Sequence, residues 1–74
     1  MSITYDREAD AAYIYLVPKE LARRVANTYA CDPQEVKGQI QLDFDESGQL
    51  IGIEVLDASR LLPEEVLVGA ASTR

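Results

Sequence analysis

The sequence predicts an α+β fold with a single antiparallel β-sheet of four or five strands, built from hairpins, and a short C-terminal helix. Several short segments alternate apolar and polar residues with a period of two, which is typical of half-buried strands. One late segment, Pro63–Val68, instead has proline at a first helical position, acids in the first turn and Gly69 beyond its end. We expect one small domain over residues 1–69 and a frayed tail over residues 70–74.

The two clearest strands flank the turn Asp45–Gly48. A four-residue loop with Gly48 in the left-handed conformation would pair Leu42 with Ile51 and keep the branched residues on one face. A three-residue loop would pair Asp43 with Ile51 and bring charge into the core face. The four-residue loop is therefore the prediction.

The remaining elements follow from local signals. A stretch that begins near Arg23 also contains residues suited to a helix, but Val25, Thr28 and Tyr29 favour a strand. Asp6 is expected to cap the amides of the first turn, and Asp57 or Ser59 those of the turn after the last strand. The expected strands are residues 3–5, 11–17, about 23–30, 39–45 and 50–56, with a loop over 31–38.

The net charge of the chain is acidic. Seven basic and thirteen acidic residues give a net charge of −6. The balance argues against nucleic acid as a partner, because phosphate binding needs clustered Lys and Arg. A basic protein partner would suit this surface, but solubility is the more common reason for an acidic surface on a small domain.

Location follows from what the chain lacks. No stretch has the length of a membrane span, and the N-terminus has no signal pattern. Cys31 is the single cysteine, which fits a reducing compartment. We therefore expect a cytoplasmic protein without a membrane partner.

One motif resembles a calcium-binding loop. Asp43, Asp45, Ser47, Gly48 and Glu54 have the spacing of EF-hand ligands. The flanking segments alternate like strands, however, and the expected register separates Asp43 from Glu54 by about 13 Å. We expect no metal site, and the alternative reading is a divalent-metal-binding protein or metal-assisted enzyme that uses Asp43, Asp45 and Glu54.

Catalysis has little support in the residue types. The chain has no histidine, so neither Cys31 nor a serine has the usual base beside it. We expect no catalytic residue and no cofactor.

Tyrosines are the better candidates for binding. Tyr13, Tyr15 and Val17 share one side of the second strand, and Tyr29 lies on the next strand. Aromatic side chains on a sheet face suit protein contacts, although packing beneath the 31–38 loop would explain them equally well. We expect these four residues to form the interface of a homo-oligomer, most simply a dimer.

Two blocks of the chain resemble a known family. They are Ile3-Thr-Tyr-Asp-Arg-Glu-Ala-Asp-Ala-Ala-Tyr-Ile-Tyr-Leu16 and the stretch Leu42–Ser59, which contains Asp43-Phe-Asp-Glu-Ser-Gly48 and Gly52-Ile-Glu-Val-Leu-Asp-Ala-Ser59. Together they are similar to the small bacterial proteins grouped as domain of unknown function 2283, over about half the chain. The resemblance implies a one-domain protein without established activity or known catalytic residues. Some relatives are encoded beside small toxin-like proteins, which implies an antitoxin-like role as one form of a protein-binding module.

Overall fold

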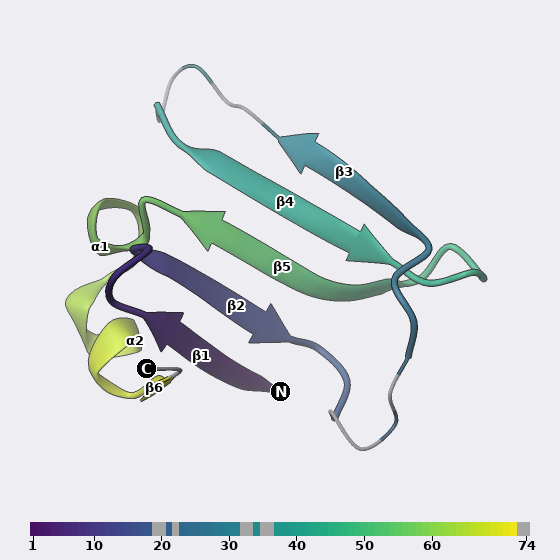
Figure 1. Ribbon diagram of the computed structural model, residues 1–74, viewed down its shortest axis with the longest axis horizontal. Helices are drawn as coiled ribbons and strands as arrows, with labels where there is room; N and C mark the ends of the chain where they lie inside the picture. Colours follow the sequence, from purple (N-terminus) through teal and green to yellow (C-terminus); the bar gives the residue numbers. More distant parts are fainter. Residues whose placement is uncertain (19–20, 22, 32–33, 35–36, 73–74) are drawn as a thin grey trace.

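The computed structural model describes residues 1–18, 21, 23–31, 34 and 37–72 (Figure 1). They form one sheet in the order β3-β4-β5-β2-β1-β6, in which all neighbours are antiparallel except β1 and β6. The predicted α+β class with an antiparallel sheet is confirmed. The elements are β1 (Ser2–Asp6), β2 (Ala11–Tyr15), β3 (Asn27–Cys31), β4 (Gln39–Phe44), β5 (Leu50–Leu56), α1 (Ala58–Leu61), α2 (Glu64–Val68) and β6 (Ala71–Ser72).

Several element boundaries differ from the prediction. The strand expected from about Arg23 begins only at Asn27, because the Arg23 guanidinium instead binds side chains of the β4–β5 turn. A second helix, α1, precedes the predicted one. The tail expected to be frayed from Ala70 includes β6, which pairs with β1 through residues 71 and 72.

The β4–β5 hairpin has the three-residue loop that the prediction rejected. The amide of Asp45 donates to the carbonyl of Gln49 (2.9 Å), and the amide of Gly48 donates to the carbonyl of Asp45 (3.0 Å). A β-bulge next to Asp43 then restores the apolar pairing. Leu42 pairs with Ile53 rather than with Ile51, so the predicted register is wrong by two residues.

The bulge also changes the side of Ile51. The prediction placed Ile51 in the core face with Leu42 and Ile53, whereas its side chain lies beside Tyr13 and Tyr15 on the opposite face. The extra residue in β5 is the physical reason, because one added residue reverses the side on which the following side chains lie.

The turn between β1 and β2 is joined to α1 through Asp10. Its carboxylate accepts hydrogen bonds from the Tyr5 hydroxyl (2.7 Å), the Ser59 hydroxyl (2.7 Å) and the Ser59 amide (2.9 Å), while its carbonyl accepts from the Ala58 amide (3.0 Å). These bonds, the one from Tyr5 foremost, lower the pKa of Asp10. Asp10 thus satisfies amides at the start of a helix far from it in sequence.

Asp6 and Asp57 have different local roles. Asp6 accepts from the amides of Glu8 (3.0 Å) and Ala9 (3.3 Å) within the first turn. The expected side-chain cap from Asp57 is absent from α1, since Asp57 has φ 60° and its carboxylate pairs with Arg60 at 3.0 Å. Asp10 supplies that cap instead.

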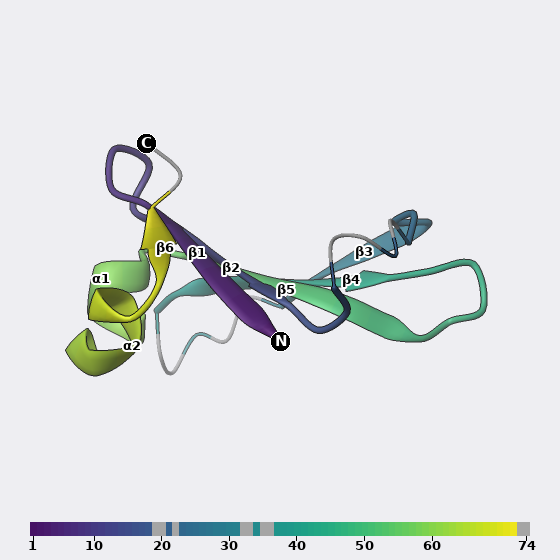
Figure 2. The ribbon, with the colours of Figure 1, turned by 90° about the horizontal axis from the view of Figure 1, so that it is seen from below.

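The helices cover one end of one sheet face. Figure 2 shows α1 and α2 on one side of the sheet, beside the ends of its strands. Ala12 and Val55 from the sheet and Ala58 from α1 form the buried cluster, and the partly buried residues around it are Tyr5, Ile53, Leu61, Leu62 and Leu67. None of the described helices is long and apolar enough to cross a membrane.

The first prediction concerns the β4–β5 turn. Gly48 has φ 81°, and a side chain there would meet no atom within 4 Å. The cost of a substitution at residue 48 is therefore backbone strain, which is larger for a branched side chain than for asparagine. Gly48→Val should lower the free energy of unfolding by more than about 1 kcal/mol, and Gly48→Asn should lower it by less. Urea melts of both variants measure this, and equal, negligible losses would contradict the turn assignment.

Candidate functional site

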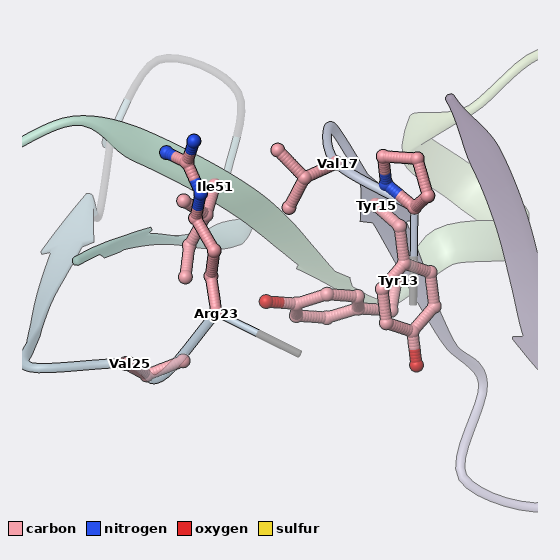
Figure 3. A pocket seen from close by; sticks show the side chains of 7 residues that line it. Tyr13, Tyr15, Val17, Arg23, Val25 and Ile51 are labelled. Atoms are coloured by element: carbon pink, nitrogen blue, oxygen red, sulfur yellow. The ribbon is translucent and has the colours of Figure 1, made fainter. Parts of the chain in front are cut away.

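The sheet face opposite the helices carries a hollow lined by tyrosines. Alternation along β2 directs Tyr13 and Tyr15 to this face, while Ala12 faces the helices. Arg23 and Val25 lie across the hollow from Tyr13 and Tyr15, as Figure 3 shows. The hollow has a volume of about 270 Å³ and is lined by Tyr13, Tyr15, Val17, Pro18, Arg23, Val25 and Ile51.

The two tyrosine rings are in direct contact. Their centroids are 4.6 Å apart and their planes meet at 61°, an edge-to-face arrangement. Val25 is 45 % exposed at the rim of the hollow. The walls are thus mostly apolar, with aromatic edges available to a bound group.

A glycine allows Tyr13 to reach across the sheet. Gly52 lies beside Tyr15 on β2 and opposite Asp43 on β4, and a side chain at residue 52 would overlap the Tyr13 ring and hydroxyl. The Tyr13 hydroxyl donates to one oxygen of Asp43 at 2.5 Å, and the Thr28 hydroxyl donates to the other at 2.7 Å. One carboxylate therefore links β2, β4 and β3 through side chains.

This network determines the protonation of Tyr13. Burial first, then the hydrogen bond to Asp43 and the charges of Asp43 and Glu54, raise the pKa of Tyr13 well above its ordinary value. At neutral pH Tyr13 is a neutral hydrogen-bond donor and not a general base.

Arg23 joins the hollow to the β4–β5 turn. Its guanidinium lies 3.1 Å from the carboxylate of Asp45 and 3.1 Å from the side-chain oxygen of Gln49. Asp45 also accepts from the amides of Gln49 and Ser47. The Gln49 amide is the main cause of the lowered pKa of Asp45, and Ser47 and Arg23 lower it further.

The carboxylates proposed for a metal are arranged differently from the prediction. The register pairs Asp43 with Gly52, so Asp43 and Glu54 are diagonal neighbours on one face, about 7–8 Å apart rather than about 13 Å. The predicted separation is wrong because of the bulge. Both oxygens of Asp43 nevertheless accept hydroxyl hydrogen bonds, and Asp45 is paired with Arg23. Within the described residues no group of three His, Cys, Asp or Glu could hold a metal ion.

The structure brings together three of the four predicted interface residues. Tyr13, Tyr15 and Val17 line the hollow, whereas Tyr29 pairs with Leu42 and lies on the opposite face, 64 % exposed. The predicted loop 31–38 includes residues outside the described ranges. Val25 and Arg23, on a segment predicted as strand, line the hollow instead.

Sequence reasoning missed Arg23 as an organising residue, and it did not connect Asp10 with α1. Arg23 offered no signal, because its partners are set by the three-residue loop. Asp10 belongs to one of the blocks that carry the family resemblance, and Ser59 ends another. The presence of both residues in these blocks was the signal that could have indicated their hydrogen bond.

Comparison with protein families matches residues 2–59 to a protein family of unknown function, DUF2283. The chain belongs to this family. The match contains the five antiparallel strands, the Tyr13–Asp43 network and the bond between Asp10 and Ser59, and it stops before α2. No curated protein and no solved structure gives a significant match.

The second prediction tests the crossing of Tyr13 over Gly52. Gly52→Ala should destabilise the fold by about 1–3 kcal/mol, because the methyl group displaces the Tyr13 ring. In a Tyr13→Val background the same change should cost at least about 1 kcal/mol less, measured as a double-mutant cycle in urea. Gly69→Ala is the control, since its added atom meets nothing closer than 3.6 Å. Additive losses at residues 13 and 52 would refute the contact.

The third prediction concerns divalent metals. Millimolar Ca²⁺ or Mg²⁺ should leave the thermal midpoint unchanged, because the oxygens of Asp43 and Asp45 already have partners. A stabilisation that is lost in both Asp45→Ala and Glu54→Ala would establish a metal site at these carboxylates.

Proposed function

We propose that this protein is a non-catalytic protein-binding or assembly module that works as a homo-oligomer, most simply a dimer. The supporting observation is the size of its core. Of the described residues, the buried apolar ones are Ala12, Ile51, Val55 and Ala58, and no large side chain is fully buried. A 74-residue chain buries only about 60 % of its unfolded surface, so association is a direct way to add burial.

The tyrosine hollow supports the binding part of the proposal. Tyr13 and Tyr15 provide aromatic edges that are held in place by contact with each other and by Asp43. Rigid aromatic side chains contribute strongly to protein interfaces, because little conformational entropy is lost on binding. A segment of a partner protein is therefore the ligand class that the hollow suits best.

Charge favours a basic partner. The chain has a net charge of −6, and Glu54 and Asp43 lie on the same face as the tyrosines. A basic segment would be steered to this face and could make ion pairs beside the aromatic rings. An antitoxin-like role toward a small basic protein is the specific form of this proposal, and the single Cys31 suits its cytoplasmic location.

The diagonal placement of Asp43 and Glu54 favours one alternative, a divalent-metal-binding protein or metal-assisted enzyme. The hydrogen bonds on Asp43 and the ion pair of Asp45 weigh against it, since a cation would have to displace Tyr13, Thr28 or Arg23.

The fourth prediction tests the assembly. Light scattering or sedimentation at micromolar concentration should give the mass of a dimer, because the monomer keeps apolar side chains partly exposed. Dilution should shift the mass toward 8.2 kDa. A wild-type protein that remains monomeric at millimolar concentration would overturn the homo-oligomer.

A further inference from the structure

A continuous row of apolar side chains crosses the sheet on the helix side. The register places them opposite one another on five adjacent strands: Ile3 with Ile14, Ile14 with Ile53, Ile53 with Leu42, and Leu42 with Tyr29. We call these five residues the apolar band. Neighbouring positions on one face of paired strands form one surface, so the band runs from β1 to the edge strand β3.

The helices leave most of the band uncovered. Ile53 is the one band residue in the cluster that packs with α1 and α2, and Figure 2 shows both helices gathered at one end of this face. Ile3, Ile14, Leu42 and Ile53 are only half-buried, and Tyr29 is 64 % exposed. The two short helices are therefore too small to cover this face.

The strands place no charged side chain on the side of the sheet that carries the band. Of the residues in β1 to β5, the three charged ones are Asp6, Asp43 and Glu54, and the alternation of the strands places all three on the tyrosine face. Whatever covers the band must therefore be apolar and needs no compensating charge. A basic partner would be attracted to the other face.

A second copy of the chain meets these requirements. It offers the same band, and contact between two bands without charged side chains limits the repulsion expected between two chains of net charge −6. The size fits as well, because the molecule measures 32 × 29 × 18 Å and its broad face is comparable to the roughly 800 Å² per partner that stable complexes bury.

We propose that two copies stack face to face through the apolar band, related by a two-fold axis, with the helices of each copy beside the free end of the other sheet. Sheets in such sandwiches lie about 10 Å apart, a separation that apolar side chains of this size fill. The inference rests on the proposed homo-oligomer and moves its interface away from Tyr13, Tyr15 and Val17. The tyrosine hollow then stays open in the dimer.

Paired substitutions on the edge strand provide the first test. Tyr29→Glu puts a charge into the band, whereas Ala30→Glu puts the same charge on the adjacent residue, which lies on the tyrosine face. Both residues are exposed in the single chain, so neither change should unfold it. Sedimentation equilibrium should show dimer dissociation constants raised more than about tenfold for Tyr29→Glu and less than about threefold for Ala30→Glu.

A second pair separates face-to-face stacking from pairing of two β3 edges. Ile3→Glu changes the band on β1, which three strands separate from β3, and Ser2→Glu is its control on the other face. Stacking predicts that Ile3→Glu weakens the dimer and Ser2→Glu does not. Edge pairing predicts that both β3 variants weaken it while Ile3→Glu has no effect, and that outcome would overturn the proposal.

The same measurements distinguish an error in the position of the interface from an error in the proposal that the protein assembles. A wild-type dimer that resists Tyr29→Glu and Ile3→Glu but dissociates with Tyr15→Glu would overturn the band and retain the assembly. A monomeric wild type would remove both. Circular dichroism of each variant shows whether the variant is still folded. If a band variant with a new charge is unfolded, Leu42→Gln, which adds no charge, takes its place in the test. Leu42→Gln should also weaken the dimer.

Discussion

The β-bulge in the central hairpin is the constraint on which both faces of the sheet depend. The three-residue loop alone would pair Asp43 with Ile51 and would mix charge into the apolar side. The bulge absorbs one residue, so that Leu42 meets Ile53 and Asp43 meets Gly52. The first pairing continues the apolar band, and the second creates the space through which Tyr13 reaches Asp43. A single extra residue thus separates the apolar face from the polar one.

The connection between the first turn and α1 has a related role. Asp10 has φ 53°, an uncommon conformation for a residue with a side chain, and its carboxylate and carbonyl together accept four hydrogen bonds from Tyr5, Ala58 and Ser59. A four-residue helix cannot be stable alone, so α1 depends on this connection and on the burial of Ala58. The family match ends at Ser59, the last residue of this arrangement. The hydrogen bonds between Asp10 and Ser59 thus explain the presence of both residues within the family match, and no ligand is needed for that explanation.

The sequence was sufficient for the fold class because the alternation in β1, β4 and β5 is local, and because β2 is rich in aromatic and branched residues. It was insufficient for the register, since the choice between loop lengths assumed an unbroken ladder and did not use Gly52, an isolated glycine in a strand pattern, as a signal for the bulge at Ile51. The hollow was predictable in part: the alternation of β2 placed Tyr13, Tyr15 and Val17 together. Arg23 and Val25 were not, because their positions follow from contacts between segments that are distant in sequence.

The two faces of the sheet offer a simple division of roles. On the tyrosine face, the carboxylate of Asp43 and the hydroxyls of Tyr13 and Thr28 satisfy one another, so these polar groups need no partner to satisfy them. On the helix face, Leu42 and Ile14 have no polar atoms, and exposure to water carries a cost that only permanent burial removes. Stable self-association therefore suits the apolar band, and reversible recognition suits the hollow. If both proposals hold, a dimer would present two hollows on its outer surfaces, and a partner with two binding segments would gain from simultaneous engagement without any new contact.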